Sequence, residues 1–248
     1  MKDNRIGSKI VWLDEVSSTN EYVSILKGDN AQHGVVVAAR NQTHGRGQRG
    51  NSWESESGKN LLFSVLLRPC FLEVQYQFLI SKISALAVVD LLLEVIPNIT
   101  IKWPNDIYVK GNKIAGILIE NSFSAANLET TIVGIGLNVN QFHFADDLPN
   151  PTSLVLETGK EADIDSLLER FCRCFELRYQ QLKAGSVRQI SDQYFASLYR
   201  SAGFNKYSAN GEAFSARIVG VKDTGMLVLE TDKGELKEFA FKEVCFVL

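Results

Sequence analysis

The sequence predicts an α+β protein with a large domain, residues 1–202, and a small β domain, residues 203–248. Apolar residues recur at helical spacing over 76–95 and 164–183. Short apolar runs bounded by turn residues, which are typical of strands, are interspersed with these helices. After Gly203 only short strand patterns remain, and Gly-containing turns separate them.

The large domain is expected to begin with a strand followed by a helix. Ser17-Ser18-Thr19-Asn20 precedes Glu21, which is an N-cap signal for a helix over 19–28. Further helices are expected at 76–95, 164–183 and 187–199. The strands are expected, in chain order, at 10–16, 34–39, 61–67, 99–103, 107–109, 113–120 and 131–138, with a long polar loop over 41–58.

The small domain is expected to contain strands at 213–221, 226–230, 236–240 and 244–247. Asp223-Thr224-Gly225 and Asp232-Lys233-Gly234 are the turn signals between them. Four or five short strands bury only a marginal core by themselves. We therefore expect the small domain to pack on the large one.

Charge and composition restrict the classes of partner. The formal net charge is −3, which gives no support to a general polyanion-binding role. The first residues contain no apolar run of signal-peptide length. The longest apolar stretch, 83–96, is interrupted by polar residues and is too short to span a bilayer. We expect no membrane partner.

The cysteines do not form a recognisable site. Cys70, Cys172, Cys174 and Cys245 have the spacing of neither a zinc site nor a disulfide framework. Cys172 and Cys174 fall in a helical pattern, where residues i and i+2 do not face each other. We interpret all four as structural, and we expect no metal-ligating residues and a cytoplasmic location.

The strongest local signal is the run His44-Gly45-Arg46-Gly47-Gln48-Arg49-Gly50. Its glycines allow the backbone to approach a ligand closely, and its arginines carry forked donors suited to phosphate. The run lies between two predicted strands, so it is not a Walker loop, which opens a helix. By itself it fits either a phosphate-binding loop or a flexible basic loop.

Two further runs point to a ligand site. In Lys102-Trp103-Pro104-Asn105-Asp106, a strand delivers a lysine to a turn. A lysine buried there needs an anionic partner, although it can also extend from a strand edge into solvent. In Gly134-Ile135-Gly136-Leu137-Asn138, alternating glycines weaken a strand. Such glycines mark close approach of a ligand, a bulge or tight sheet packing.

Taken in order, these motifs resemble the biotin–protein ligase family. The resemblance runs from about residue 10 to the C-terminal strands. The matching stretches are Ser18-Thr19-Asn20, Gln42 with Gly45 to Gly50, Trp53, Lys102 to Asp106, Lys113 with Ala115-Gly116-Ile117, Gly134 to Asn138, and Thr152-Ser153-Leu154.

The resemblance implies a mixed sheet with flanking helices, as in class II aminoacyl-tRNA synthetases and lipoate ligases, plus a C-terminal SH3-like β-barrel. Some bacterial members also carry an N-terminal helix-turn-helix that represses biotin genes. The strand predicted at 10–16 begins within ten residues of the start, so we expect no such domain and no nucleic-acid partner. A homodimer formed through strand edges is compatible with the fold.

The resemblance also implies a biotin–[biotin carboxyl carrier protein] ligase that uses ATP, Mg²⁺ and biotin. Biotin attacks the α-phosphorus of ATP to give biotinyl-5′-AMP, and a lysine of a carrier protein, or of a carrier domain of a biotin-dependent carboxylase, then attacks this mixed anhydride. No covalent enzyme nucleophile is required, so the protein works by positioning and by neutralising charge.

The resemblance assigns residues to three overlapping roles. The catalytic residues are Lys102, Arg46, Lys113 and Asp106. The biotin-binding residues are Ser18, Thr19, Asn20, Gln42, Arg46, Gly47, Gln48, Lys102, Gly134 and Gly136. The nucleotide-binding residues are Arg46, Gln48, Arg49, Trp53, Asn105 and Lys113.

The chain departs from the family at Gln48, where many relatives have arginine. Glutamine donates hydrogen bonds but carries no charge, so its contact with phosphate is the weakest of these assignments.

Two other functions compete with this interpretation. A lipoate ligase or a lipoyl/octanoyl transferase shares the fold, but the Gly-Arg-Gly loop and the Lys-Trp-Pro-Asn-Asp run argue against both, and no cysteine motif matches the nucleophile of a transferase. A non-catalytic biotin sensor is the second, and Arg46, Lys102 and Lys113 argue against it by favouring ATP chemistry.

Overall fold

A computed structural model describes residues 5–26 and 32–247 of the chain. Within these residues, seven strands form one mixed sheet in the order β1-β2-β3-β7-β6-β5-β4, in which only β1 and β2 are parallel. Its strands are β1 (Lys9–Val16), β2 (Val35–Gln42), β3 (Leu61–Leu67), β4 (Ile99–Lys102), β5 (Asp106–Val109), β6 (Asn112–Ser124) and β7 (Asn127–Leu137).

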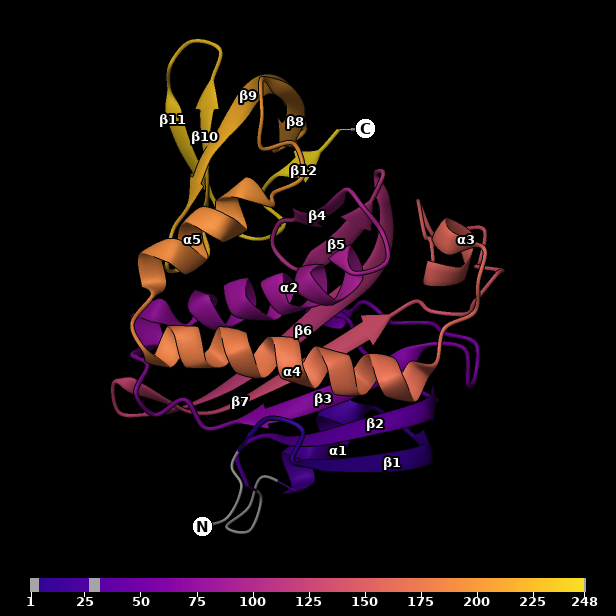
Figure 1. The fold of residues 1–248 in the computed structure, drawn as a ribbon. Helices are drawn as coiled ribbons and strands as arrows, with labels where there is room; N and C mark the ends of the chain where they lie inside the picture. The colour runs from indigo at the N-terminus through magenta and orange to yellow at the C-terminus, as the bar shows by residue number, and fades with distance from the viewer. Residues whose placement is uncertain (1–4, 27–31, 248) are drawn as a thin grey trace.

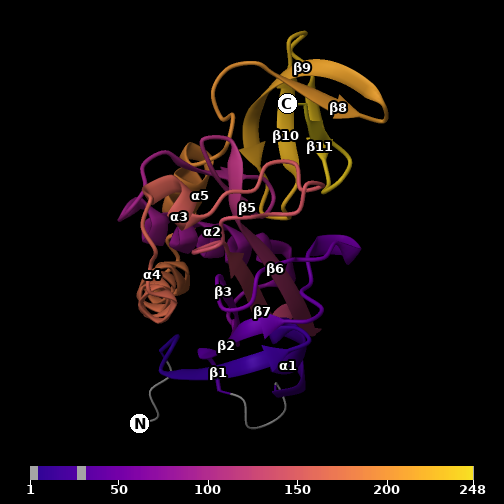
Figure 2. The ribbon, with the colours of Figure 1, turned by 90° about the vertical axis from the view of Figure 1, so that its right-hand side faces the viewer.

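Helices cover the two faces of this sheet unequally. The α-helices are α1 (Thr19–Leu26), α2 (Phe78–Leu93), α3 (Leu154–Thr158), α4 (Ile164–Lys183) and α5 (Val187–Ala196), and the short 3-10 helices are η1 (Gln48–Gly50) and η2 (Val74–Tyr76). Helices α2 and α4 lie on one face, and α1 lies on the other, against β2, β3 and β7 (Figures 1 and 2). The rest of that second face is free to carry a site.

Strand alternation produces this division. In β7, Val133, Ile135 and Leu137 belong to the main hydrophobic core under α2 and α4. Ile132 packs instead with Val23 of α1 in a small separate cluster. Because successive side chains point to opposite faces, Gly134 and Gly136 lie on the α1 face.

The most apolar helix is explained by burial in this core. The stretch Val74–Leu93 is long and apolar enough to span a membrane, but 67% of its most apolar 18-residue window is buried inside the protein. The expectation from sequence rested on the stretch 83–96 alone, and the helical segment reaches this length because it begins earlier, at Val74; its burial is that of a core helix. The amphipathic α4 packs beside it, and Asp163 caps α4 by accepting from the Ser166 and Asp165 N–H groups, a contact that typically contributes about 1 kcal/mol.

The C-terminal residues form a second, antiparallel sheet in the order β11-β10-β9-β8-β12. Its strands are β8 (Asn205–Ala209), β9 (Glu212–Val221), β10 (Leu227–Thr231), β11 (Leu236–Phe239) and β12 (Cys245–Phe246). This sheet stands at the β4–β5 end of the large sheet (Figure 1). The fold class is thus confirmed, while the domain boundary at 202/203 stays a prediction.

Segment 197–199 ties the second half of the chain to the edge strand β4. The Ile101 N–H donates to the Ser197 carbonyl at 2.8 Å, and the Tyr199 N–H donates to the Ile101 carbonyl at 2.8 Å. These bonds cover the β4 edge, next to Lys102. At the other edge, β1 pairs only with β2 among the described strands, and the homodimer stays a prediction.

Most predicted elements lie where the sequence indicates, within a few residues at their ends. Residues 27–28, the end of the helix expected at 19–28, lie outside the described part of the chain. Besides the short 3-10 helices η1 and η2, two elements were not predicted, namely the five-residue α3 and the strand β8.

Candidate active site

A cavity of about 800 Å³ lies on the α1 face of the large sheet, and it reaches from the start of α1 to the C-terminal sheet. A cavity of this size suits a small-molecule ligand. The predicted site residues that line it are Ser18, Thr19, Asn20, Gln42, Arg46, Gly47, Gln48, Trp53, Lys102, Asn105, Asp106, Lys113, Gly134 and Gly136. The fold thus brings the three sequence motifs to one place. The Arg49 side chain lies outside the described part of the structure.

A buried polar network forms one end of the cavity. The Thr19 N–H donates to Gln42 Oε1 at 2.7 Å. Ser64 Oγ lies 2.7 Å from Thr19 Oγ1 and 2.6 Å from Asn20 Oδ1. Thr19, Asn20 and Ser64 are all buried, so these bonds fix their polar atoms. Ser64 was not predicted, and its only signal is a serine within the apolar run of β3.

Glu120 joins this network to the glycine–arginine loop. Its Oε2 accepts from Asn20 Nδ2 at 2.8 Å, and its Oε1 pairs with the Arg46 guanidinium at 3.0 Å. Both side chains of the pair are partly exposed, at 50% for Arg46 and 35% for Glu120. The ion pair is therefore weak enough for Arg46 to exchange its partner for a bound anion.

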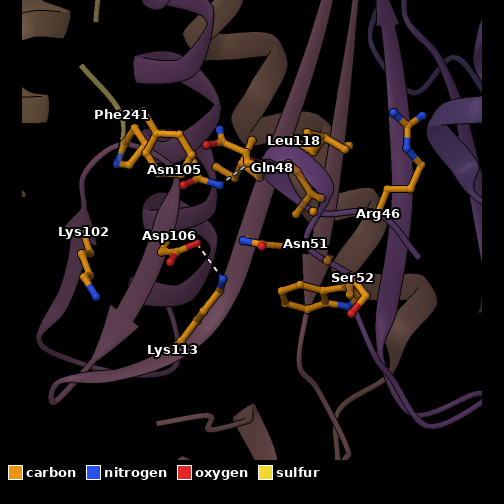
Figure 3. Close-up of a pocket in the computed structure, with 18 of the residues that line it drawn as sticks. Arg46, Gln48, Asn51, Ser52, Lys102, Asn105, Asp106, Lys113, Leu118 and Phe241 are labelled. Atoms are coloured by element: carbon orange, nitrogen blue, oxygen red, sulfur yellow. Dashed lines mark hydrogen bonds and ion pairs between the residues drawn. The ribbon is translucent and has the colours of Figure 1, made fainter. Parts of the chain in front are cut away.

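The loop itself is folded back as a narrow hairpin. The Gly47 N–H donates to the Asn51 carbonyl at 2.7 Å, and the Trp53 N–H donates to the Gly45 carbonyl at 2.9 Å. The short helix η1 forms its tip. Figure 3 shows Arg46 at one side of the labelled group, opposite Lys102, and Gln48 near its middle, with Asn51 and Ser52 below them.

Trp53 occupies the flat part of the sheet left by two glycines. A Cβ atom on Gly136 would lie 2.4 Å from the indole, and one on Gly116 would lie 2.9 Å from it. A Cβ atom on Gly134 would lie 2.1 Å from Asn20 Oδ1. These glycines therefore make room for protein side chains in this structure, whereas the sequence interpretation left that space to the biotin ring.

The indole N–H of Trp53 is buried and has no hydrogen-bond partner in the described structure. Lys113 Nζ lies 5.5 Å from the centre of the indole ring, which permits a cation–π contact. A buried donor without a partner is costly, so a ligand acceptor that reaches it gains binding energy.

The polar side chains of the Lys-Trp-Pro-Asn-Asp turn point to different partners (Figure 3). Asp106 pairs with Lys113 at 2.8 Å, and Asn105 Nδ2 donates to the Ile117 carbonyl at 2.8 Å. Lys102 Nζ donates to the Tyr108 hydroxyl at 2.9 Å and has no carboxylate partner among the described residues. Asp106 therefore orients Lys113, and Lys102 keeps its charge available for a ligand.

The C-terminal sheet supplies lining residues that the sequence did not indicate. They are Phe241, Lys242, Val244, Cys245 and Phe246. Cys245, interpreted from sequence as structural, is exposed and lines the cavity. Cys172 is buried, and burial raises the pKa of its thiol to about 12, which excludes it as a nucleophile near neutral pH.

Among the described residues, no group of three or more His, Cys, Asp or Glu side chains could hold a metal ion. Asp106 is the carboxylate that lines the cavity, and it is paired with Lys113. Mg²⁺ commonly binds through one or two carboxylates together with substrate phosphates, so this donor set fits a metal carried by a nucleotide.

Comparison with known proteins places the chain among ligases. Residues 12–138 match the model of the Biotin/lipoate A/B protein ligase family. The chain is 32% identical to the Bifunctional ligase/repressor BirA of Bacillus subtilis, covering 97% of this chain and 75% of that protein. It is 31% identical to the Biotin–[acetyl-CoA-carboxylase] ligase of Mycobacterium tuberculosis, covering 93% of this chain and 88% of that protein.

The fold is shared with a solved structure. The biotin protein ligase from Aquifex aeolicus in complex with biotin and ATP superposes with a TM-score of 0.76 at 29% identity, covering 96% of this chain and 98% of that one.

Proposed function

The chain belongs to the biotin/lipoate A/B protein ligase family, and from this premise we infer that it is a biotin–protein ligase. It activates biotin with ATP as biotinyl-5′-AMP and transfers the biotinyl group to a lysine of a carrier protein. The named relatives and the solved structure with biotin and ATP support biotin over lipoate or octanoate as the substrate.

One observation about this chain carries the proposal. Three motifs that lie far apart in the sequence, the Arg46 loop, the Lys102 turn and the Gly134 strand, line a single cavity. That cavity has a buried neutral network at one end and cationic side chains along its walls. This distribution matches biotinyl-AMP, whose ureido ring is neutral and polar and whose phosphate is anionic.

The neutral end of the cavity is assigned to the biotin ring. Ser18, Thr19 and Gln42 lie where they can hydrogen-bond the ureido group, while Asn20 holds the turn in place through Ser64 and Glu120. The buried, prearranged donors and acceptors favour a ligand with complementary polar groups.

The cationic walls are assigned to the reacting groups. Lys102 bridges the biotin carboxylate and the α-phosphate, and Lys113, held by Asp106, contacts the phosphate. Arg46, with the backbone of Gly47 and Gln48, covers the adenylate. Asp106 and Asn105, which line the cavity, would supply oxygens to a Mg²⁺ ion brought in with ATP. No covalent intermediate on the protein is required.

We further propose a biotin carboxyl carrier protein, or the equivalent domain of a carboxylase, as the acceptor, and the cytoplasm as the place of reaction. The relatives named for acetyl-CoA carboxylase support the carrier class.

The transfer assay tests the function. Incubation with biotin, ATP-Mg and a biotin carboxyl carrier domain should biotinylate one lysine, detected by mass spectrometry, and a carrier with that lysine changed to arginine is the control. Because Cys245 lines the cavity, Cys245→Ser is included. The direct attack of the carrier lysine predicts full activity for Cys245→Ser, whereas its inactivation would indicate a thioester route of the transferase kind.

A further inference from the structure

Lys242 is presented to the cavity by a tight turn of the C-terminal sheet. The turn spans 240–243, where the Glu243 N–H donates to the Ala240 carbonyl at 3.1 Å and the Ala240 N–H donates to Glu243 Oε2 at 2.7 Å. Lys242 has a φ of 74°, in the left-handed region that residues other than glycine rarely adopt. The closed turn holds this conformation, and such backbone positions often occur at functional sites.

The turn is anchored on both sides of Lys242. Phe241 packs on Trp103 with 6.4 Å between ring centres, and Val244 is buried. Trp103 directly follows Lys102 in the chain. The position of Lys242 is therefore tied to the strand that carries Lys102.

The docking of the C-terminal sheet fixes this arrangement further. Trp103 Nε1 donates to the Gly225 carbonyl at 2.9 Å, and the buried Lys82 ammonium pairs with Asp223 at 3.2 Å. A buried lysine requires such a partner, so the contact specifies one position of the 223–225 turn on α2. The 240–243 turn is held in the same docked sheet.

The cations that line the cavity differ in their partners. Arg46 is paired with Glu120, Lys113 with Asp106, and Lys102 with the Tyr108 hydroxyl. Among the described residues, Lys242 makes no ion pair or hydrogen bond through its ammonium group and is exposed at the cavity. Within the described structure it is thus a cation at the cavity whose charge is not paired.

We propose that Lys242 binds the β- and γ-phosphates of ATP and stabilises the pyrophosphate leaving group. A biotin carboxylate oxygen forms a bond to the α-phosphorus, and the bond from that phosphorus to the oxygen bridging to the β-phosphate breaks. The departing pyrophosphate keeps the electron pair, and the Lys242 ammonium stabilises its new charge without transferring a proton. The C-terminal sheet thereby supplies a catalytic residue. This inference rests on the adenylation activity proposed above.

The test compares adenylation with transfer. Lys242→Asn removes the charge, and asparagine tolerates positive φ, so the turn is kept. Lys242→Arg keeps the charge. Lys233→Asn, at the exposed tip between β10 and β11, is the matched control. ATP–pyrophosphate exchange in the presence of biotin measures the first half-reaction, and transfer from purified biotinyl-AMP to the carrier measures the second.

For Lys242→Asn, kcat/KM for ATP-Mg should fall roughly 10- to 100-fold, the effect of one hydrogen bond to a charged group, and inhibition by pyrophosphate should weaken. Transfer from biotinyl-AMP should be unchanged, because no pyrophosphate takes part, and Lys242→Arg should retain exchange. Unchanged exchange in Lys242→Asn, or an equal loss in both half-reactions, would overturn the proposal. Absence of exchange in the wild-type protein would instead overturn the adenylation activity itself.

Discussion

Gly134 shows how a single residue sets the shape of the site. Its missing Cβ leaves room for Asn20, which links Ser64 to Glu120 and through it to Arg46. The sequence pattern of alternating glycines indicated close approach, but it could not show whether a ligand or a side chain makes that approach. That answer depends on α1, more than 100 residues earlier in the chain.

Gly134→Ala should therefore displace Asn20 and weaken biotin binding. The added methyl group would lie 2.1 Å from Asn20 Oδ1, and overpacking of this kind typically costs about 1–3 kcal/mol, which corresponds to a rise in Kd of roughly 5- to 150-fold. Isothermal titration with biotin measures it. Gly220→Ala, at a strand position with nothing within 4 Å of the new Cβ, is the control and should bind normally. Equal affinities would show that Asn20 does not shape the biotin site.

Lys102→Ala should separate binding from chemistry. Its ammonium group has no carboxylate partner among the described residues, so it is available to the developing charge at the α-phosphate. Loss of one such donor typically lowers the rate about 10²- to 10³-fold. Biotin should still bind, because the polar network assigned to its ureido ring lies elsewhere. Adenylation at the rate of a Lys160→Ala control would show that Lys102 is only structural.

At the scale of elements, the helices and central strands follow from apolar periodicity, because each buries one face or both. The elements that were missed lack this signal. In β8, Tyr207 is the buried residue among polar neighbours, so no alternation is visible. Helix α3 has five residues, and its Ser153 cap precedes too short an apolar run to be distinguished from a loop.

The loop over 43–58 is the element whose protection from proteolysis should change when biotinyl-AMP binds. Its tip is held by few bonds, and Arg46 is paired only with the partly exposed Glu120. With biotinyl-AMP, Arg46 gains a charge-assisted partner. Limited proteolysis should therefore cleave this loop in the free protein and spare it with a non-hydrolysable biotinyl-AMP analogue. Arg46→Gly should release biotinyl-AMP faster, and Gln48→Arg should retain it longer. Equal cleavage with and without the analogue would refute gating by this loop.

For the whole molecule, the site depends on how two sheets dock. The three sequence motifs predicted the part of the cavity built by the large sheet, since they lie on strands of that sheet and on the loop and helix beside them. The wall formed by Phe241, Lys242 and Phe246 was not predictable, because it depends on contacts such as Lys82–Asp223 and Trp103–Gly225, which join residues over 100 positions apart.

Asp223→Asn should loosen this docking. Lys82 is 2% exposed and would lose its charged partner, keeping only the Ser191 hydroxyl and a neutral amide oxygen as acceptors. The cost should be on the order of 1–2 kcal/mol, below the 3–5 kcal/mol of a fully buried pair, because Asp223 is 42% exposed. Urea denaturation measures the free energy of unfolding. Asp232→Asn, in the equivalent turn between β10 and β11, should be neutral. A similar small effect of both changes would show that the ion pair does not hold the sheets together.

The most direct test of the proposed function is to determine which carboxylic acid the protein adenylates. ATP–pyrophosphate exchange should be measured with biotin, octanoate and lipoate, each without a carrier protein, so that adenylation alone is observed. The polar network at Thr19, Gln42 and Asn20 gives this end of the cavity polar groups that suit the ureido ring, whereas an alkyl chain would place apolar surface against them. Exchange with biotin and none with octanoate or lipoate is the predicted result. Exchange with octanoate or lipoate and none with biotin would contradict it.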